Sequence, residues 1–299
     1  GHDAQVAAQA ATRLAAATMR ICSEHTAEGV IWDVDANLRP EGKDGALVRT
    51  LSGHVSYYER WASTWEFQAL LKARHAAGDE ALVAEYLAAV TPMVWSASSR
   101  PDFVASTRAM RQRVVDNIAV QHRERELKLG VGGLRDVEFA VQLLQLVHGR
   151  ADESLRSPNT LEALAALMNG GYVGRRDGAV LEEAYEFLRT LEHRIQLFRL
   201  RRTHLVPTDE EDLRRIGRSM GFRQRSAELL EREWQAERRV VRRLHEKIFY
   251  RPLLEAVASI PTEGLRLTPD EASDRLAALG FDDPAGALAN IRALTGGVS

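Results

Sequence analysis

The sequence predicts a mainly α-helical protein, with one or two short strands near its amino-terminal end, then an antiparallel helical bundle and a short helical hairpin. Three observations predict this class. Apolar residues recur at helical spacing over nearly all of the chain after residue 80. Glycines, prolines and helix caps divide that stretch into helices with short connections, which favours an antiparallel bundle. The runs that suit a strand are short and lie before residue 75.

The composition limits the classes of function. The chain has 299 residues, of which 45% are hydrophobic, so it can bury the core of one large or two modest domains. A net charge of -2 gives no general attraction to nucleic acid or to an anionic membrane. The single cysteine, Cys22, excludes an internal disulfide and favours a reducing compartment such as the cytoplasm. There is no signal peptide and no apolar run of membrane-spanning length. The missing initiating Met predicts that this is part of a longer protein.

The chain begins with a predicted helix, and the predicted strand that follows it carries two carboxylates on one face. Residues 4–24 are rich in alanine, with apolar side chains at helical spacing, which predicts a helix. The run Val30-Ile31-Trp32-Asp33-Val34-Asp35 is rich in β-branched and aromatic residues, which predicts a strand. Strand side chains alternate, so Asp33 and Asp35 are expected on one face. Two carboxylates there suit a metal site; solvated acids on an exposed edge strand are the alternative.

A second short run carries two cations. A turn-forming loop at 38–45, which contains Arg39, leads to a predicted helix from His54 to Trp65 with its aromatic residues in the core. Residues 69–74 could form a second strand, with Lys72 and Arg74 on one face. A phosphate could dock against these two cations; ordinary surface charge is the alternative.

Helices account for nearly all of the remaining chain. Thr208 and Glu211 have the spacing of a capping box, and Gly221 is a helix stop. A linker at 261–267 precedes the predicted hairpin of residues 268–294. The predicted bundle helices run from 80 to just before Thr91-Pro92, then over 101–120, 134–147, 159–168, 179–202 and 226–257, the last with a break before Pro252.

The stretch at residues 126–139 predicts both the centre of the fold and a possible anion site. A loop with three glycines opens into a helix that is apolar on nearly every side beyond its first turn, which predicts burial. The charges of Arg135, Asp136 and Glu138 all lie in that first turn. A helix start with free N–H groups, glycines and the nearby Lys128 can hold an anion. The alternative is a tight glycine turn followed by capping charges.

Three segments in fixed order, 34–42, 65–74 and 128–139, resemble the family of bifunctional glutamine synthetase adenylyltransferase/adenylyl-removing enzymes, and the resemblance runs from about residue 30 to 255. In that family, two related halves each contain a nucleotidyltransferase domain and a helical bundle. One half adds AMP from ATP to a tyrosine of glutamine synthetase; the other removes it with inorganic phosphate and releases ADP. The chain resembles the removing, amino-terminal half more, because a further capped hairpin follows its bundle.

The resemblance implies roles for individual residues. Asp35 matches one of three carboxylates that hold two Mg²⁺ or Mn²⁺ ions, which makes it the expected catalytic and metal-binding residue, with Asp33 ranked below it. Glutamine synthetase is the expected partner, together with a PII-type nitrogen-signalling protein. The expected phosphate- or nucleotide-binding residues are Arg39, Lys72, Arg74, Lys128, Gly132, Gly133 and Arg135, with Asp136 and Glu138 as further candidates.

The chain departs from the family pattern in one respect. The Gly-Ser-Asp-x-Asp motif that supplies the other two carboxylates is absent, so the chain alone is expected to be inactive. The resemblance divides the chain into the carboxyl-terminal part of a nucleotidyltransferase domain (3–90), a helical bundle (91–258), and a linker with the start of a following helical region (259–299). Two alternatives stay open: the ATP-dependent adding half, and a non-catalytic helical module that binds glutamine synthetase or a nitrogen-signalling protein.

Overall fold

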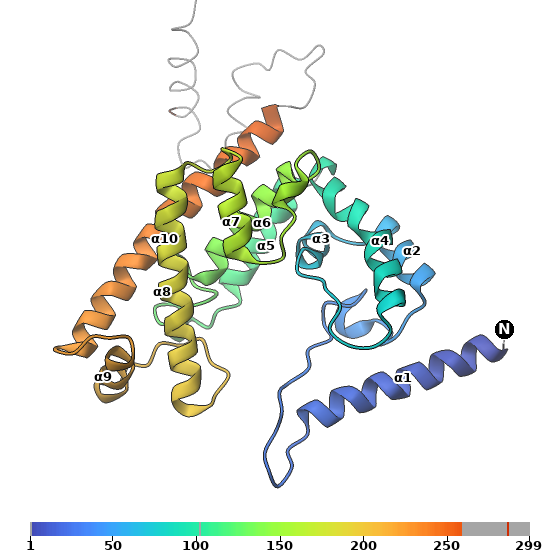
Figure 1. Cartoon of the computed structure of the whole chain (residues 1–299), viewed down its shortest axis with the longest axis horizontal. Helices are drawn as coiled ribbons and strands as arrows, with labels where there is room; N and C mark the ends of the chain where they lie inside the picture. Colours follow the sequence, from blue (N-terminus) through green and yellow to red (C-terminus); the bar gives the residue numbers. More distant parts are fainter. Residues whose placement is uncertain (1, 102, 259–285, 287–299) are drawn as a thin grey trace, which may run out of the picture. The chain divides into compact units, whose positions relative to one another are not determined.

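The computed structural model describes residues 2–101, 103–258 and 286. These residues are mainly α-helical, as predicted, and their only β pairing is two isolated bridges, Thr26–Gly29 and Glu126–Leu205. No helix in the described ranges is long and apolar enough to cross a membrane. The helices shown in Figure 1 are α1 His2–Ser23, α2 Leu51–Arg60, α3 Thr64–Leu70, α4 Glu80–Ser96, α5 Phe103–Asp116, α6 Leu134–His148, α7 Thr160–Asn169, α8 Arg175–Arg199, α9 Glu210–Ser219 and α10 Ser226–Ala258.

The helices belong to one compact unit, Gly1–Leu254, except for the last residues of α10. A second unit, Glu255–Ser299, contributes only the end of α10 and Gly286 to the described residues. The predicted linker at 261–267 and nearly all of the hairpin at 268–294 therefore lie outside them. The predicted division at residues 90 and 258 stays a prediction.

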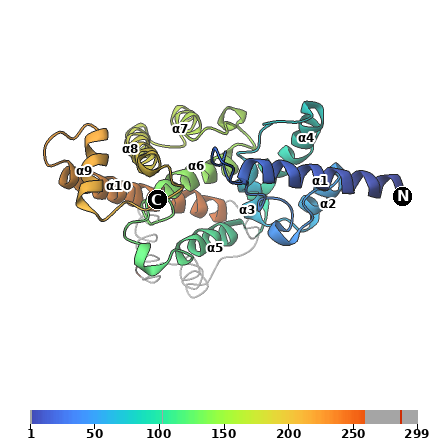
Figure 2. The ribbon, with the colours of Figure 1, turned by 90° about the horizontal axis from the view of Figure 1, so that it is seen from below.

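Helix α6 is the centre of the first unit. It packs against α3, α4, α7 and α8, as Figures 1 and 2 show. Its residues Leu134, Val137 and Val141 belong to a core cluster shared with α7–α10, whereas Phe139 and Leu143 belong to a second cluster shared with α2–α4. Both faces of α6 are thus covered, which explains why its sequence is apolar all round. The predicted burial of this helix is confirmed.

Side-chain caps place the starts of several bundle helices. Asn159 caps α7 by accepting hydrogen bonds from two backbone N–H groups of its first turn. Asp209 caps α9 in the same way, so the predicted capping box at Thr208 is wrong by one residue. Gly221, with φ of 95°, follows the end of α9 as predicted.

The predicted strand at 30–35 is wrong. This segment is irregular, and its hydrogen bonds run locally, from Trp32 N–H to Cys22 O and from Val34 N–H to Ser23 Oγ. Its apolar side chains are exposed, because none of the described residues forms a neighbouring strand or a hydrophobic surface against it. Asp33 and Asp35 therefore do not share the face of a strand.

The predicted second strand at 69–74 is also wrong. Ser63 forms a capping box with Glu66 and starts α3, so the single helix predicted from His54 to Trp65 is divided into α2 and α3. Residues 69 and 70 complete α3, and the chain then turns into an irregular loop that carries Lys72 and Arg74.

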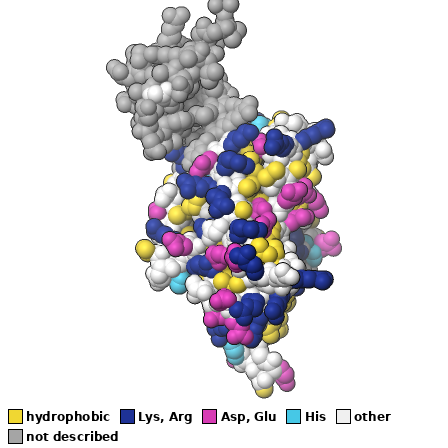
Figure 3. All heavy atoms as spheres, turned by 90° about the vertical axis from the view of Figure 1, so that its left-hand side faces the viewer, with side chains coloured by type: hydrophobic (Ala, Val, Ile, Leu, Met, Phe, Trp, Pro, Cys, Tyr) yellow, Lys and Arg dark blue, Asp and Glu magenta, His cyan; other side chains and the backbone are white. Residues whose placement is uncertain are grey.

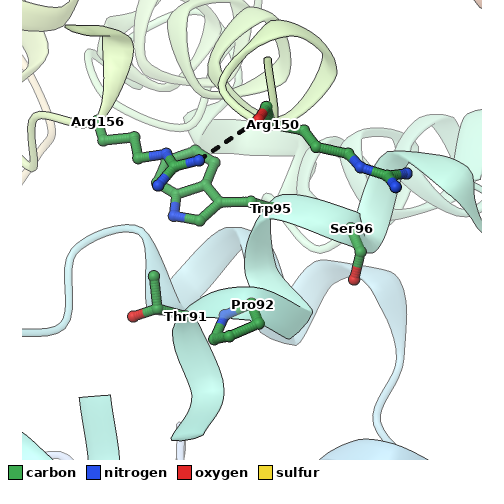
Figure 4. Close-up of a pocket in the computed structure, with 6 residues that line it drawn as sticks. All are labelled: Thr91, Pro92, Trp95, Ser96, Arg150 and Arg156. Atoms are coloured by element: carbon green, nitrogen blue, oxygen red, sulfur yellow. Dashed lines mark hydrogen bonds between the residues drawn. The ribbon is translucent and has the colours of Figure 1, made fainter. Parts of the chain in front are cut away.

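Helix α4 continues through Pro92, where the sequence predicted a stop. A proline inside a helix removes one hydrogen bond and costs about 3 kcal/mol. The buried neighbours Val90, Val94 and Trp95 offset this cost, because they anchor α4 on both sides of the proline. Figure 4 shows Pro92 beside Trp95 at a cavity of about 370 Å³. Helix α10 likewise continues through residue 252 without the predicted break.

Candidate functional site

The loop before α6 is fixed to the segment that follows α8. Leu127 N–H donates to His204 O at 2.9 Å, beside the isolated bridge between Glu126 and Leu205. The Glu126 side chain turns back and accepts hydrogen bonds from the N–H groups of Lys128 and Leu129. The loop is therefore held by its own hydrogen bonds and by the segment after α8 at the start of the buried helix.

The three glycines of this loop are required by close backbone contacts. A Cβ atom on Gly130 would clash with Glu126 O, and one on Gly133 would clash with Leu127 O. Gly132 has φ of 75° and lies against the backbone carbonyl of Arg238 in α10, so a side chain there would meet both strain and overlap. The geometry accounts for all three glycines without a ligand.

The backbone N–H groups at the start of α6 are already bonded within the chain. Gly132 N–H donates to the Asp136 carboxylate at 2.7 Å. The predicted anion site on Gly132 and Gly133 is therefore closed, and the tight-turn alternative describes the structure. The following N–H groups donate to loop carbonyls: Gly133 to Gly130 O, Leu134 to Leu127 O, Arg135 to Lys128 O and Asp136 to Gly133 O.

Asp136 is a structural residue. Its side chain is 1% exposed, and Oδ1 accepts a hydrogen bond from Arg111 Nε of α5 at 2.5 Å. The same guanidinium reaches the carbonyl of Leu129 in the loop. His245 of α10 places Nδ1 3.0 Å from the backbone oxygen of Asp136 and Nε2 3.8 Å from its carboxylate, and burial lowers the pKa of His245. This carboxylate thus joins α5, α6, α10 and the loop, and it has no free face for a ligand.

Next to this network, cations gather around two buried carboxylates. Arg135 Nη1 lies 3.4 Å from Glu138, and Arg189 Nη2 lies 3.2 Å from the same carboxylate. Arg189 Nη1 also pairs with Glu192 at 2.5 Å, and Lys128 Nζ lies 3.3 Å from Glu192. We call Lys128, Arg135 and Arg189 the cationic cluster. Three cations share two carboxylates, which leaves one positive charge unbalanced.

The cationic cluster faces solvent, whereas its carboxylates do not. The side chains of Lys128, Arg135 and Arg189 are 22%, 32% and 34% exposed, against 9% for Glu138 and 3% for Glu192. Buried carboxylates thus hold cations whose side chains remain partly exposed to solvent. This arrangement suits an anion with several oxygen acceptors, because guanidinium groups bind such anions with parallel hydrogen bonds.

Lys72 lies beside this cluster. Its Nζ donates to Thr160 Oγ1 at 3.0 Å, at the start of α7. Burial lowers the pKa of Lys72; the charge of Glu138 opposes the shift, and the charges of Arg189 and Arg135 reinforce it. Of the predicted phosphate-binding cations, the structure therefore brings Lys72, Lys128 and Arg135 into one neighbourhood.

Two other predicted cations lie outside this neighbourhood. The Arg39 guanidinium donates to the carbonyls of Ala36, Lys43 and Gly45, so it braces its own loop. Arg74 donates to the carbonyl of the next residue. The structure thus shows a local bracing role for Arg39 and ordinary surface placement for Arg74.

The acidic residues do not build a metal centre by themselves. Asp35 Oδ1 accepts a hydrogen bond from Asn37 N–H, and Asp33 lies 4.0 Å from the Arg202 guanidinium. Within the described part of the chain, no three His, Cys, Asp or Glu side chains converge to hold a metal ion. A two-metal centre needs more oxygen ligands than Asp33 and Asp35 supply, so these two residues alone do not fit it.

The sequence prediction missed the contribution of α8. Tyr185 OH lies 3.4 Å from Glu138, and Arg189 Nε donates to Tyr185 OH at 3.1 Å. His204 Nδ1 lies 3.0 Å from Glu192, although the ring is not aligned for a regular hydrogen bond. One signal was present in the sequence: Glu192 interrupts an apolar stripe of α8 between Leu188 and Ile195, and a charge in such a stripe requires partners.

Replacing Gly132 with Ala tests the steric account of the loop. Ala at this φ costs about 1 kcal/mol, and overlap with Arg238 O adds about 1–3 kcal/mol. Gly171→Ala is the matched control, because Gly171 has φ of 76° with nothing within 4 Å of the added Cβ. Urea denaturation followed by circular dichroism should show the larger loss for Gly132→Ala. Equal losses would contradict the account.

The acid side of the stability profile tests Glu192. Burial favours the neutral acid, but His204, Arg189 and the charge of Lys128 outweigh it and lower the pKa of Glu192 from 4.5 to about 2. The ionised group therefore stabilises the fold above pH 4.5, and this stabilisation disappears as the pH falls toward 2. We expect Glu192→Gln to lower the free energy of unfolding by about 1–3 kcal/mol at pH 7 and by progressively less below pH 4.5.

The control is Glu228→Gln, which removes one partner of an exposed ion pair with Arg225. Exposed pairs contribute about 0–1 kcal/mol, so this variant should remain close to the parent protein. A Glu192→Gln effect that stays constant from pH 6 to pH 3 in urea titrations would rule out the ionisation of this group as its cause.

Two family models match the chain in succession. The one described as Glutamate-ammonia ligase adenylyltransferase matches residues 1–89, and the one described as GlnD PII-uridylyltransferase matches residues 108–249. The two matches lie on either side of the predicted boundary at residue 90.

Curated relatives match the whole chain, and each is named bifunctional glutamine synthetase adenylyltransferase/adenylyl-removing enzyme. The relative from Streptomyces avermitilis is 65% identical over 299 residues, the one from Streptomyces coelicolor 64% over 297, and the one from Mycolicibacterium smegmatis 53% over 293. The matches cover 100%, 99% and 96% of this chain, but 30%, 30% and 29% of the relatives. These matches confirm the resemblance inferred from the three sequence segments, and the chain spans about 30% of the length of the bifunctional glutamine synthetase adenylyltransferase/adenylyl-removing enzymes that it matches.

Proposed function

We propose that this chain is part of the half of such an enzyme that removes AMP from the adenylylated tyrosine of glutamine synthetase. In this reaction, an oxygen of inorganic phosphate attacks the phosphorus of the AMP–tyrosine linkage. The bond from phosphorus to the tyrosine oxygen breaks, the tyrosine oxygen takes a proton, and ADP leaves. The proposal places the reaction in the cytoplasm, where glutamine synthetase is the substrate.

The cationic cluster is the observation that carries this proposal. Both reacting groups are anionic, so their approach is opposed by charge repulsion until fixed cations offset it. Lys128, Arg135 and Arg189 supply those cations at one partly exposed surface, and Lys72 lies beside them. Glu138 and Glu192 hold the cations in place before a ligand arrives, which reduces the entropy lost on binding.

The contacts of the acidic segment support its place near the cluster. Asp33 lies 4.0 Å from Arg202, which is two residues before His204. His204 in turn lies 3.0 Å from Glu192, to which Lys128 is paired. The segment after α8 thus links the neighbourhood of Asp35 to the cationic cluster. Within the proposal, Asp35 and a bound Mg²⁺ or Mn²⁺ act only in a complete nucleotidyltransferase domain that supplies the other carboxylates.

Two alternatives use the same surface differently. In the adding half of the enzyme, the cationic cluster would hold the phosphates of ATP instead of inorganic phosphate. In a helical interaction module, it would bind an acidic surface of glutamine synthetase or of a PII-type protein. The match of residues 108–249 to the model described as GlnD PII-uridylyltransferase supports a link to PII signalling. We favour the removing half because the sequence predicts a further capped hairpin after the bundle.

Kinetics of the complete enzyme test the proposal. Lys128→Gln and Arg135→Gln should each lower kcat/KM for phosphate in ADP formation from adenylylated glutamine synthetase by about 10- to 100-fold, because each removes a charge-assisted contact. Binding of adenylylated glutamine synthetase, measured by surface plasmon resonance, should stay within about twofold. Arg215→Gln on α9 is the control, since Arg215 forms an exposed pair with Glu211 and lies 5.9 Å from the centre of the Phe198 ring, and neither residue belongs to the cationic cluster.

Other outcomes of this experiment point to the alternatives. Weakened binding of glutamine synthetase with normal turnover per complex would favour the interaction module. Lost ATP consumption with unchanged ADP formation would favour the adding half. The 299-residue chain by itself should release no ADP; phosphate-dependent ADP release by the isolated chain would show that the described carboxylates suffice.

A further inference from the structure

A second concentration of positive charge lies at the start of α8. A cavity of about 650 Å³ opens there between the first turn of α8 and the middle of α10. Val180 and Leu244 give it an apolar wall, and the remaining lining is mostly cationic. Its lining residues are Gly174, Arg175, Arg176, Asp177, Val180, Arg243, Leu244 and Lys247.

Most of these cations have no partner within the described residues. Lys247 Nζ pairs with Asp177 at 2.6 Å. The side chains of Arg175, Arg176 and Arg243 form no hydrogen bond or ion pair with any described residue. Four cations against one carboxylate leave a net charge of +3 around the cavity. Figure 3 shows the side of the molecule on which α8 and α10 lie, with many Lys and Arg side chains in its upper part.

The cavity beside Pro92 provides a contrast. Two arginines line it as well, but Arg150 donates to Ser99 Oγ, and Arg156 donates to Gly149 O, with its guanidinium 5.0 Å from the centre of the Trp95 ring. Figure 4 shows Arg156 stacked against Trp95. Those arginines hold the turn after α6 in place. Arg175, Arg176 and Arg243 make no comparable contact with any described residue.

Unpaired like charges around one cavity repel one another, and this repulsion raises the free energy of the folded chain. An anion that enters the cavity relieves it. Guanidinium groups prefer phosphate, because their planar N–H groups match phosphate oxygens in parallel pairs. The cavity volume lies in the range of about 300–1,000 Å³ that is typical of small-molecule sites. Its concave form and apolar wall suit a small ligand better than the surface of a protein.

We propose that this cavity binds a small polyanion that carries two or more phosphate groups, at a site separate from the cationic cluster. Arg175 and Arg176 of α8 and Arg243 of α10 contact the phosphate oxygens from two sides. The two sites are distinct, because Arg175 and Arg189 are 14 residues apart on α8. At about 1.5 Å rise per residue, this spacing corresponds to about 21 Å along the helix.

Calorimetric titration with inorganic pyrophosphate tests the proposal. The 299-residue chain with Lys128→Gln/Arg135→Gln, which removes phosphate contacts of the cationic cluster, should bind pyrophosphate saturably with one site per chain in low-salt buffer with EDTA. The double variant Arg175→Gln/Arg243→Gln should weaken this binding at least about tenfold, because it removes one guanidinium from each side. Both side chains are exposed, so the variant should melt at the parent temperature in circular dichroism.

Two further comparisons make the result specific. Arg214→Gln/Arg215→Gln removes the same charge from α9, where each arginine pairs with a glutamate one turn away, and it should change affinity less than about twofold. Restoring Lys128 and Arg135 of the cationic cluster should add a second site and leave the affinity of the cavity unchanged. Equal weakening by the α9 variant, no weakening by Arg175→Gln/Arg243→Gln, or no saturable binding would each overturn the proposal.

Discussion

The buried carboxylate of Asp136 is the constraint on which the centre of this structure depends. It binds Arg111 of α5 through one oxygen and Gly132 N–H through the other, while His245 of α10 approaches its backbone carbonyl. A charge 1% exposed is tolerated only when its oxygens are satisfied, and removing one partner of such a pair costs about 3–5 kcal/mol. The residues that bind Asp136 are therefore those that position the loop and α6 relative to α5 and α10.

This constraint also determines where a ligand can bind. Because Asp136 and the loop carbonyls satisfy the first N–H groups of α6, the helix start is closed to an anion. The side chains of Lys128 and Arg135 instead lie near Arg189 of α8, and the three cations pair with two buried carboxylates. In the proposed function, the phosphate contacts come from side chains of three separate segments, and the backbone of the loop serves to position two of them.

The sequence predicted those parts that depend on local pattern. The apolar residues on nearly every side of 134–147 beyond its first turn predict a buried central helix, and the structure confirms both its burial and the position of Lys128 and Arg135 beside its start. The strand predicted at 30–35 is wrong, because β-branched residues form a strand only where a neighbouring strand can pair with them. Arg189 and Glu192 were missed because Glu138 and Lys128, which link them to the start of α6, lie more than 50 residues away in sequence. Such contacts follow from the packing of α6 against α8, which local periodicity does not encode.

A double-mutant cycle between Arg111 and Asp136 tests the central claim most directly. Arg111→Met, Asp136→Asn and the combined variant are compared by urea denaturation at pH 7. If the pair fixes the loop to α6, each single variant is strongly destabilised, and the coupling free energy reaches about 2 kcal/mol or more. Single effects that add within about 0.5 kcal/mol would contradict the claim, because they would show that Asp136 does not depend on Arg111 for its place in the fold.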